Sequence, residues 1–309
     1  MPKLNGSAVA WIIGYLLVWS GATLIVGQAP GGDWSEPATI MVIFGIILPA
    51  LGWFFTRKAE PPQIPVKNPP LETAAVIGYL VLYAVVFLGW GMTTVRAGFP
   101  EGPSQELAVG GMKVLVHVVL PALLMAILGA RVAPLFRLGV KDRGFWPALI
   151  VIGALLLGLL CVISPSLKQI SGLSAGPETF AWAVPGALLW LIITVGLCEE
   201  FLFRAVLQSR LTAFLKSGTG AIVVGSILFA LAHFPGLQYR ADADTMGHFD
   251  NPLLTAAYTI AVLSPAGFFF GVLWSRTRSL ALVVLLHVCV DILPNLSEFV
   301  QTWRPVFGG

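Results

Sequence analysis

The stretch Leu197-Cys-Glu-Glu-Phe-Leu-Phe-Arg-Ala-Val-Leu-Gln-Ser-Arg210 places two adjacent carboxylates, Glu199 and Glu200, and the guanidinium of Arg204 inside an apolar run. Upstream, residues 181–198 carry no charge at all. A charged side chain near the middle of a bilayer costs about 3 kcal/mol or more, so it usually has a function or a partner there. The stretch therefore predicts a membrane-crossing helix that carries a polar site.

The composition of the whole chain supports a membrane protein. Of the 309 residues, 57% are hydrophobic and only 11% are charged, whereas soluble domains carry about 25% charged residues. The net charge of +3 and the absence of a basic stripe with interleaved aromatic residues exclude a nucleic-acid partner. Cys161, Cys198 and Cys289 lie in or beside apolar runs without CxxC spacing, so we interpret them as small buried hydrophobic residues.

Nine apolar runs are long enough to cross, or nearly cross, a hydrocarbon core of about 30 Å. They predict an all-α, polytopic membrane protein with about nine transmembrane helices and the lipid bilayer as its surroundings. The runs lie at 8–27, 38–56, 73–94, 112–130, 146–163, 181–207, 221–237, 253–274 and 280–296.

The loops between these runs alternate in charge. By the positive-inside rule, the loops rich in lysine and arginine face the cytoplasm, so we expect a multi-pass protein of the cell membrane with a cytoplasmic N-terminus and an external C-terminus. The proline-rich segment 60–70 is predicted to be a stiff cytoplasmic connector. We divide the chain into four N-terminal helices within 1–145 and a core within 146–309. The basic loop residues are Arg57, Lys58, Lys67, Arg131, Arg137, Lys141, Arg143, Arg210, Lys216, Arg276 and Arg278.

Three ionisable groups are predicted to lie at the same depth. Measured from the basic loops at 1.5 Å per helical residue, Glu199 is roughly 16 Å deep, His233 roughly 18 Å and His287 roughly 13 Å. These values agree within about one helical turn, near the middle of the bilayer. We therefore expect the three segments to meet in a polar cavity at membrane depth, and the count favours an opening on the cytoplasmic side.

Spacing along the helices suggests how these groups are supported. Glu200 and Arg204 are four residues apart and can pair. Glu199 points about 100° away and has no local counter-charge, so it is suited to act as a general base on water beside a histidine. His287 and Asp291 are also four apart, and the aspartate can fix the tautomer of the imidazole.

Three short motifs follow one another on successive apolar segments: Glu199-Glu200-x-x-x-Arg204, Phe229-x-x-x-His233 and His287-x-x-x-Asp291. This arrangement resembles the CPBP family of intramembrane proteases, also called the CAAX-protease and bacteriocin-processing or abortive-infection family, which includes the Ras-converting CAAX endopeptidase. The resemblance covers roughly residues 181–296. It implies an endopeptidase whose substrate is a membrane-embedded or membrane-associated peptide, and cleavage near a lipidated or hydrophobic C-terminus is one form that this activity can take.

The resemblance also implies catalytic roles. Glu199 would activate the hydrolytic water with help from His233, while Glu200 and Arg204 would support and orient the site. His287 and residue 291 would stabilise the oxyanion of the tetrahedral intermediate.

Position 291 departs from the family pattern, because the CAAX endopeptidases usually have asparagine there. An ionised Asp291 cannot donate a hydrogen bond to an oxyanion, so it either orients His287 or stays protonated.

Several alternatives remain open. Family members are regarded as glutamate-dependent, so we expect no cofactor, although Glu199, His233 and His287 are also a chemically reasonable zinc set. Glu200 and Arg204 can equally be a structural ion pair. The whole chain can also be a non-catalytic scaffold or immunity protein of the same shape, or a proton-coupled transporter. We interpret His117 and Phe229 as structural, and His248 with Asp242, Asp244 and Asp250 as a solvated loop rather than a metal site.

Overall fold

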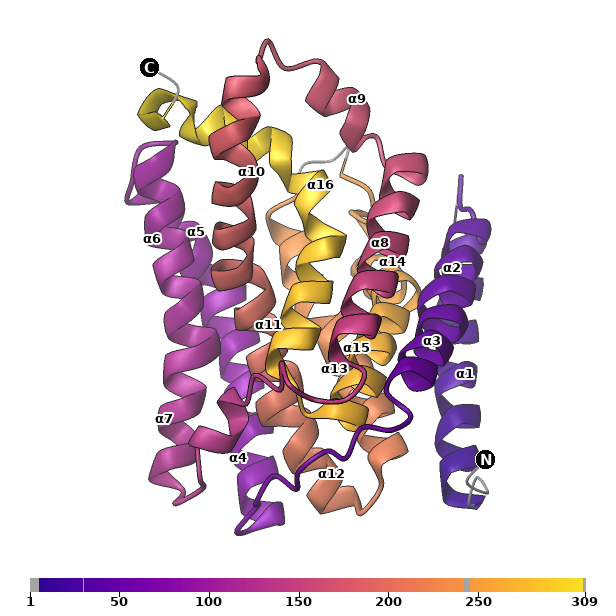
Figure 1. Ribbon diagram of the computed structural model, residues 1–309. Helices are drawn as coiled ribbons and strands as arrows, with labels where there is room; N and C mark the ends of the chain where they lie inside the picture. Colours follow the sequence, from indigo (N-terminus) through magenta and orange to yellow (C-terminus); the bar gives the residue numbers. More distant parts are fainter. Residues whose placement is uncertain (1–5, 30, 242–244, 308–309) are drawn as a thin grey trace.

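The computed structural model describes residues 6–29, 31–241 and 245–307. This part of the chain is mostly helical and contains no strand, and nine of its helices are long and apolar enough to cross a membrane (Figure 1). The predicted all-α polytopic architecture is confirmed. The sixth and ninth spans extend further than their apolar runs indicated, to Leu215 and Phe307. The spans are Gly6–Gly27, Ser35–Phe55, Pro69–Ala97, Pro103–Ile127, Phe145–Ile163, Pro177–Leu215, Gly218–Tyr239, Pro252–Thr277 and Leu280–Phe307.

Five of the nine spans are interrupted by π-helical turns, in which backbone hydrogen bonds run from residue i to i+5. Such turns often mark functional sites because they shift the register of the side chains that follow. The π-helical stretches are Met41–Ile47, Tyr83–Gly91, Leu115–Val119, Ile192–Leu197, Phe201–Gln208 and Thr259–Leu263.

The α-helices are α1 (Gly6–Gly27), α2 (Ser35–Ile40), α3 (Leu48–Phe55), α4 (Pro69–Leu82), α5 (Met92–Ala97), α6 (Pro103–Val114), α7 (Leu120–Ile127), α8 (Phe145–Ile163), α9 (Ser166–Ser171), α10 (Pro177–Leu191), α11 (Cys198–Glu200), α12 (Ser209–Leu215), α13 (Gly218–Tyr239), α14 (Pro252–Tyr258), α15 (Ser264–Thr277) and α16 (Leu280–Phe307), with a 3₁₀ turn at Ala133–Phe136.

Two tight turns position the helices that carry the site. α12 ends at Lys216 and α15 ends at Arg278, and both residues adopt the left-handed conformation with φ of 49°. The next residue, Ser217 or Ser279, accepts a hydrogen bond from a backbone N–H in the first turn of the following helix, at 3.0 and 3.2 Å. A serine at this position is a strong start signal for a helix. The turns therefore reverse the chain within two residues and set α13 beside α12 and α16 beside α15.

Small residues allow close packing around the seventh span. A Cβ atom added to Gly267 of α15 would lie 3.0 Å from the Cα of Ser226 in α13, so a larger residue would require the two helices to shift. Large buried side chains, including Phe203, Phe269 and Trp274, fill the centre of the bundle. This packed centre lies on the same side of the site as the α12–α13 and α15–α16 turns.

The basic loops gather at one end of the bundle, the lower end in Figure 1. We call it the basic end; it contains residues 56–68, 128–144, 216–217 and 278–279. At this end Glu72 of α4 pairs with Arg210 of α12 at 3.2 Å. Residues 98–102 and 164–176 lie at the opposite end, together with the C-terminal part of α16.

Candidate active site

Glu199 lies between two imidazoles. Its Oε2 atom is 3.7 Å from Nε2 of His233 and 3.8 Å from Nε2 of His287. These groups come from α11, α13 and α16, so the predicted convergence of three distant segments is confirmed. The separations are longer than direct hydrogen bonds. The side chain of Glu199 is 18% exposed and that of His233 is 34% exposed, so this cluster is open to a cavity.

The tautomer of His233 is fixed by its own helix. Its Nδ1 atom lies 2.9 Å from the carbonyl oxygen of Phe229, one turn earlier. Because a carbonyl oxygen can only accept, Nδ1 carries the proton and Nε2 faces Glu199 with a free lone pair when the ring is neutral. The Phe229 ring packs against His233, with centroids 4.8 Å apart, and lies under the guanidinium of Arg204. Phe229 therefore packs as the sequence suggested.

Glu200 contacts both Arg204 and His287, and so links its own span to α16. One of its oxygens accepts a hydrogen bond from Nε of Arg204 at 3.1 Å, which confirms the predicted pair, and both side chains are fully buried. The other oxygen lies 2.7 Å from Nδ1 of His287. Phe270 stacks on the His287 ring at 4.9 Å and 13°. Glu200 and Phe270 together hold the His287 imidazole in one orientation.

Asp291 approaches His287 from the other side of the ring. Its Oδ2 atom lies 3.4 Å from Nε2 of His287 and has no hydrogen-bond partner in the described part of the chain. Asp291 and His287 thus lie close together, as their spacing predicted, and Glu200 makes the shorter contact to the ring, at Nδ1. One turn later, Pro294 removes a backbone donor from α16, which bends helices. Figure 1 shows the C-terminal part of α16 turning away from its first part.

Across residues 6–29, 31–241 and 245–307, no group of three or more histidine, cysteine, aspartate and glutamate side chains has the spacing of a metal site. In the loop between the seventh and eighth spans, His248 Nδ1 lies 2.7 Å from the carbonyl oxygen of Leu237. Asp242 and Asp244 lie outside the described residues.

The comparison with known families identifies the part of the chain that holds this cluster. Residues 180–293 match the family described as type II CAAX prenyl endopeptidase Rce1-like. We call residues 180–293 the Rce1-like segment, after the family to which they are similar. The match confirms the resemblance to the CPBP family, and it includes Glu199, His233, His287 and the groups that support them. No curated protein and no solved structure matches the chain.

A deep cavity of about 160 Å³ lies beside Glu199 and His233. Helices outside the Rce1-like segment form one of its walls: Tyr83 comes from the third span, and Lys113 and His117 come from the fourth. His117 is buried; its Nε2 lies 2.8 Å from the Tyr83 hydroxyl, and its Nδ1 lies 2.8 Å from the carbonyl oxygen of Lys113. The full lining is Tyr83, Leu88, Met92, Lys113, His117, Glu199, Phe203, Ala232, His233, Gly236 and Arg240.

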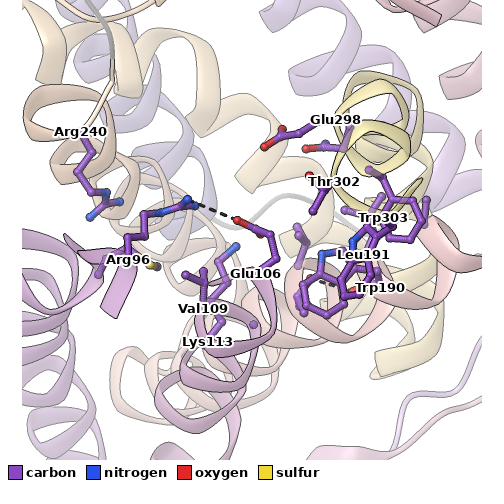
Figure 2. A pocket seen from close by; sticks show the side chains of 17 residues that line it. Arg96, Glu106, Val109, Lys113, Trp190, Leu191, Arg240, Glu298, Thr302 and Trp303 are labelled. Carbon is purple, nitrogen blue, oxygen red and sulfur yellow. Dashed lines mark hydrogen bonds and ion pairs between the residues drawn. The ribbon is translucent and has the colours of Figure 1, made fainter. Parts of the chain in front are cut away.

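A larger outer cavity of about 300 Å³ adjoins the deep one. Figure 2 shows the side chains that line this outer cavity. Both cavities are lined by Met92, Lys113 and Arg240. The outer cavity is bordered by Arg96 and Thr302, which lie near the ends of their spans opposite the basic end. The expected opening on the side of the basic loops is therefore wrong. The depth count measured how far each group lies from the basic loops and did not show which side of the site is open. Between the site and the basic end, buried aromatic side chains fill the bundle.

Three features of the site were not predicted from the sequence. The contact between Glu200 and His287 joins residues 87 positions apart, so no local spacing reveals it. Lys113 begins the apolar part of the fourth span and was left out of the site, although a lone cation four residues before a buried histidine was a visible signal. Arg240 lies just beyond α13, and its guanidinium donates a hydrogen bond to the carbonyl oxygen of Leu88. Burial lowers the pKa of Arg240 from its ordinary value.

Proposed function

We propose that this chain is an intramembrane endopeptidase that hydrolyses a peptide bond of a membrane-associated protein or peptide. The observation that carries the proposal is the position of Glu199 Oε2, 3.7 and 3.8 Å from the Nε2 atoms of two histidines at one end of a cavity. The Rce1-like segment supports protease activity at the level of the family. A water molecule bound among these three atoms would contact two proton acceptors, the Glu199 carboxylate and Nε2 of His233.

The proposed reaction begins with the activation of that water. Its proton passes to the Glu199 carboxylate while the Nε2 lone pair of His233 holds the other hydrogen. The water oxygen forms a bond to the carbonyl carbon of the substrate and produces a tetrahedral intermediate. When the C–N bond breaks, the proton passes from Glu199 to the departing amine. The sum is the addition of one water across one peptide bond, and the catalytic groups are restored.

His287 is proposed to stabilise the oxyanion. With Nδ1–H donating to Glu200, a second proton on Nε2 would give the ring a donor directed toward the cluster. The nearby carboxylates of Glu200 and Asp291 favour this charged form of the ring. Asp291 then either helps to orient His287 as a carboxylate or stays protonated and donates directly.

The proposal includes no metal, and it places the protein in the cell membrane with its basic end in the cytoplasm. With that orientation, the cavity mouth faces the outside. The substrate is proposed to be a peptide with a hydrophobic or lipid-linked part, because apolar helices surround the cavity and the bilayer surrounds the helices.

The deciding experiment compares the wild-type chain with Glu199→Gln in liposomes, using a library of quenched fluorescent peptides. Loss of the general base is expected to lower the cleavage rate by about 10²- to 10⁴-fold. Glu178→Gln is the matched control, because Glu178 is exposed at the start of the same span and lies outside both cavities. A chelator in the wild-type assay should change nothing. Cleavage by Glu199→Gln at the wild-type rate would end the proposal.

A further inference from the structure

Lys113 is a cation inside a membrane span without a close partner. Two fully buried cations of the interior have carboxylate partners: Arg204 pairs with Glu200 and Arg210 pairs with Glu72. The ammonium of Lys113 has no hydrogen bond or ion pair with the described residues, although it lies in the fourth span, Pro103–Ile127. A charge at this depth is costly unless water, a partner or a ligand compensates it.

The position of Lys113 connects it to both cavities. It lines the deep cavity together with Glu199 and the outer cavity together with Glu298 and Arg240. Figure 2 shows Lys113, Arg96 and Arg240 on one side of the outer cavity, and Glu298 and Thr302 on the other. Lys113 therefore lies where the two cavities share lining residues, between the outer cavity and Glu199.

The charges around Lys113 leave a positive surplus on its side of the passage. Arg96 and Glu106 form an ion pair at 3.4 Å and largely cancel each other. Arg240 remains, because a hydrogen bond to the carbonyl oxygen of Leu88 leaves its charge uncompensated, and arginine stays protonated in proteins. Two cations, Lys113 and Arg240, thus line the junction of the two cavities.

We propose that Lys113, assisted by Arg240, binds a carboxylate of the peptide substrate close to the scissile bond; this subsite rests on the proposed peptidase function. A sphere with the volume of the deep cavity is roughly 7 Å across, the length of about two extended residues at ~3.4 Å each. The carboxylate therefore lies within a few residues of the bond that Glu199 attacks. It is either the C-terminal carboxylate of the substrate or the side chain of an aspartate or glutamate.

A simpler role for Lys113 makes a different prediction. If the ammonium only balances the charge of Glu199 and Asp291 across the cavity, removing it will slow the cleavage of every peptide equally. If the ammonium instead binds a substrate carboxylate, removing it will slow the peptides that carry this carboxylate more than the others. The relative rates for peptides with and without the carboxylate therefore separate the two roles.

The experiment uses three quenched peptides of one sequence: one with a free C-terminus, one with a C-terminal amide, and one amidated with an aspartate as its last residue. A charged hydrogen bond is worth about 10- to 100-fold in kcat/KM, so the wild type should prefer a carboxylate peptide over the plain amide by that factor. Comparison of the free C-terminus with the terminal aspartate identifies which carboxylate is bound. Lys113→Gln should slow cleavage of the carboxylate peptides about 10- to 100-fold more than cleavage of the plain amide, whereas Lys113→Arg should retain the preference.

Lys168→Gln is the matched control, because Lys168 lies on α9 at the same end of the bundle and outside both cavities. The proposal is overturned if the wild type shows no carboxylate preference, or if Lys113→Gln slows all three peptides by the same factor.

A binding measurement keeps this test independent of the proposed hydrolysis. In the Glu199→Gln background, the tripeptide leucyl-valyl-leucine should bind about 10- to 100-fold more tightly than its amide, and Lys113→Gln should equalise the two. Equal affinities in Glu199→Gln would refute the subsite even if the wild type cleaves peptides. Failure of the wild type to cleave any peptide would instead count against the proposed function.

Discussion

The bundle contains two buried glutamate–arginine pairs that look alike in isolation. Glu200–Arg204 has an Nε–Oε2 distance of 3.1 Å and Glu72–Arg210 one of 3.2 Å, and all four side chains are almost completely shielded from solvent. In both arginines the terminal nitrogens have no hydrogen-bond partner among the described residues. The pairs differ only in what the second carboxylate oxygen contacts.

At the basic end, the second oxygen of Glu72 accepts the backbone N–H groups of Lys67 and Asn68 at 2.7 and 2.8 Å. Asn68 in turn caps α4 ahead of two prolines. Glu72 therefore holds the proline-rich connector against the bundle. At the site, the second oxygen of Glu200 holds His287. A glutamate–arginine pair thus has a structural role at the basic end and a proposed catalytic role at the site, and the two differ in the partners of the second carboxylate oxygen.

The largest effect is expected from Glu72→Ala, which leaves Arg210 buried without its partner and two backbone N–H groups unpaired. Removing one member of a buried ion pair costs about 3–5 kcal/mol. Thermal unfolding in detergent micelles measures this loss, with Glu60→Ala in the exposed part of the connector as the control. The folded fraction should cleave peptides at the wild-type rate. A lower rate per folded molecule would show that Glu72 also affects the site, and the two pairs would then not differ in role.

The second-largest effect is expected from Glu200→Gln. The amide keeps the shape of the side chain but removes the charge that holds His287, so kcat/KM should fall by about 10- to 100-fold, the usual cost of losing an outer partner of a catalytic group. Peptide cleavage per folded molecule is the measurement, and Glu72→Gln is the matched control. If the two glutamine variants lose activity equally, Glu200 is only structural.

A smaller effect is expected from Phe229→Leu. The ring of Phe229 packs under the Arg204 guanidinium and against His233. Cation–π contacts contribute about 0.5–2 kcal/mol, which corresponds to a loss of about 2- to 30-fold in activity if the contact positions the site. Phe44→Leu, another buried phenylalanine of the same core but away from the arginine, should leave the rate unchanged. Equal rates in the two variants would limit Phe229 to packing.

The smallest effect is expected from Asp291→Asn. Glu200 already makes the short contact to His287, and asparagine is about the size of aspartate and can donate to an oxyanion. Cleavage should therefore stay within about threefold of the wild type across a pH series, since a hydrogen bond at this distance is weak. A loss similar to that of Glu200→Gln would make the Asp291 charge essential.

The sequence was sufficient to predict the helices and the meeting of Glu199, His233 and His287. Depth along a helix follows from residue number alone, because the rise per residue is constant and the basic loops mark one common level. The Glu200–Arg204 pair was predictable for a similar reason, since four residues make about one turn.

The remaining features depend on how the helices are rotated and bent. The contact of Glu200 with His287 requires the rotation of α16 against α11, and the π-helical turns on both sides of α11 change that rotation without a clear sequence signal. The direction of the opening depends on which side of the site is packed with large side chains. That packing brings together residues from five or more spans, so no single run indicates it.

The wall of the deep cavity has a consequence for how such enzymes diversify. Tyr83, Lys113 and His117 come from helices that precede the Rce1-like segment, whereas the groups assigned to bond cleavage all lie within it. The proposed contact of Lys113 with the substrate thus comes from a helix that precedes the groups proposed for bond cleavage, although Arg240 lies within the Rce1-like segment. If both proposals hold, exchanging the early helices for those of another protein should change which peptide is cleaved while the reaction stays the same.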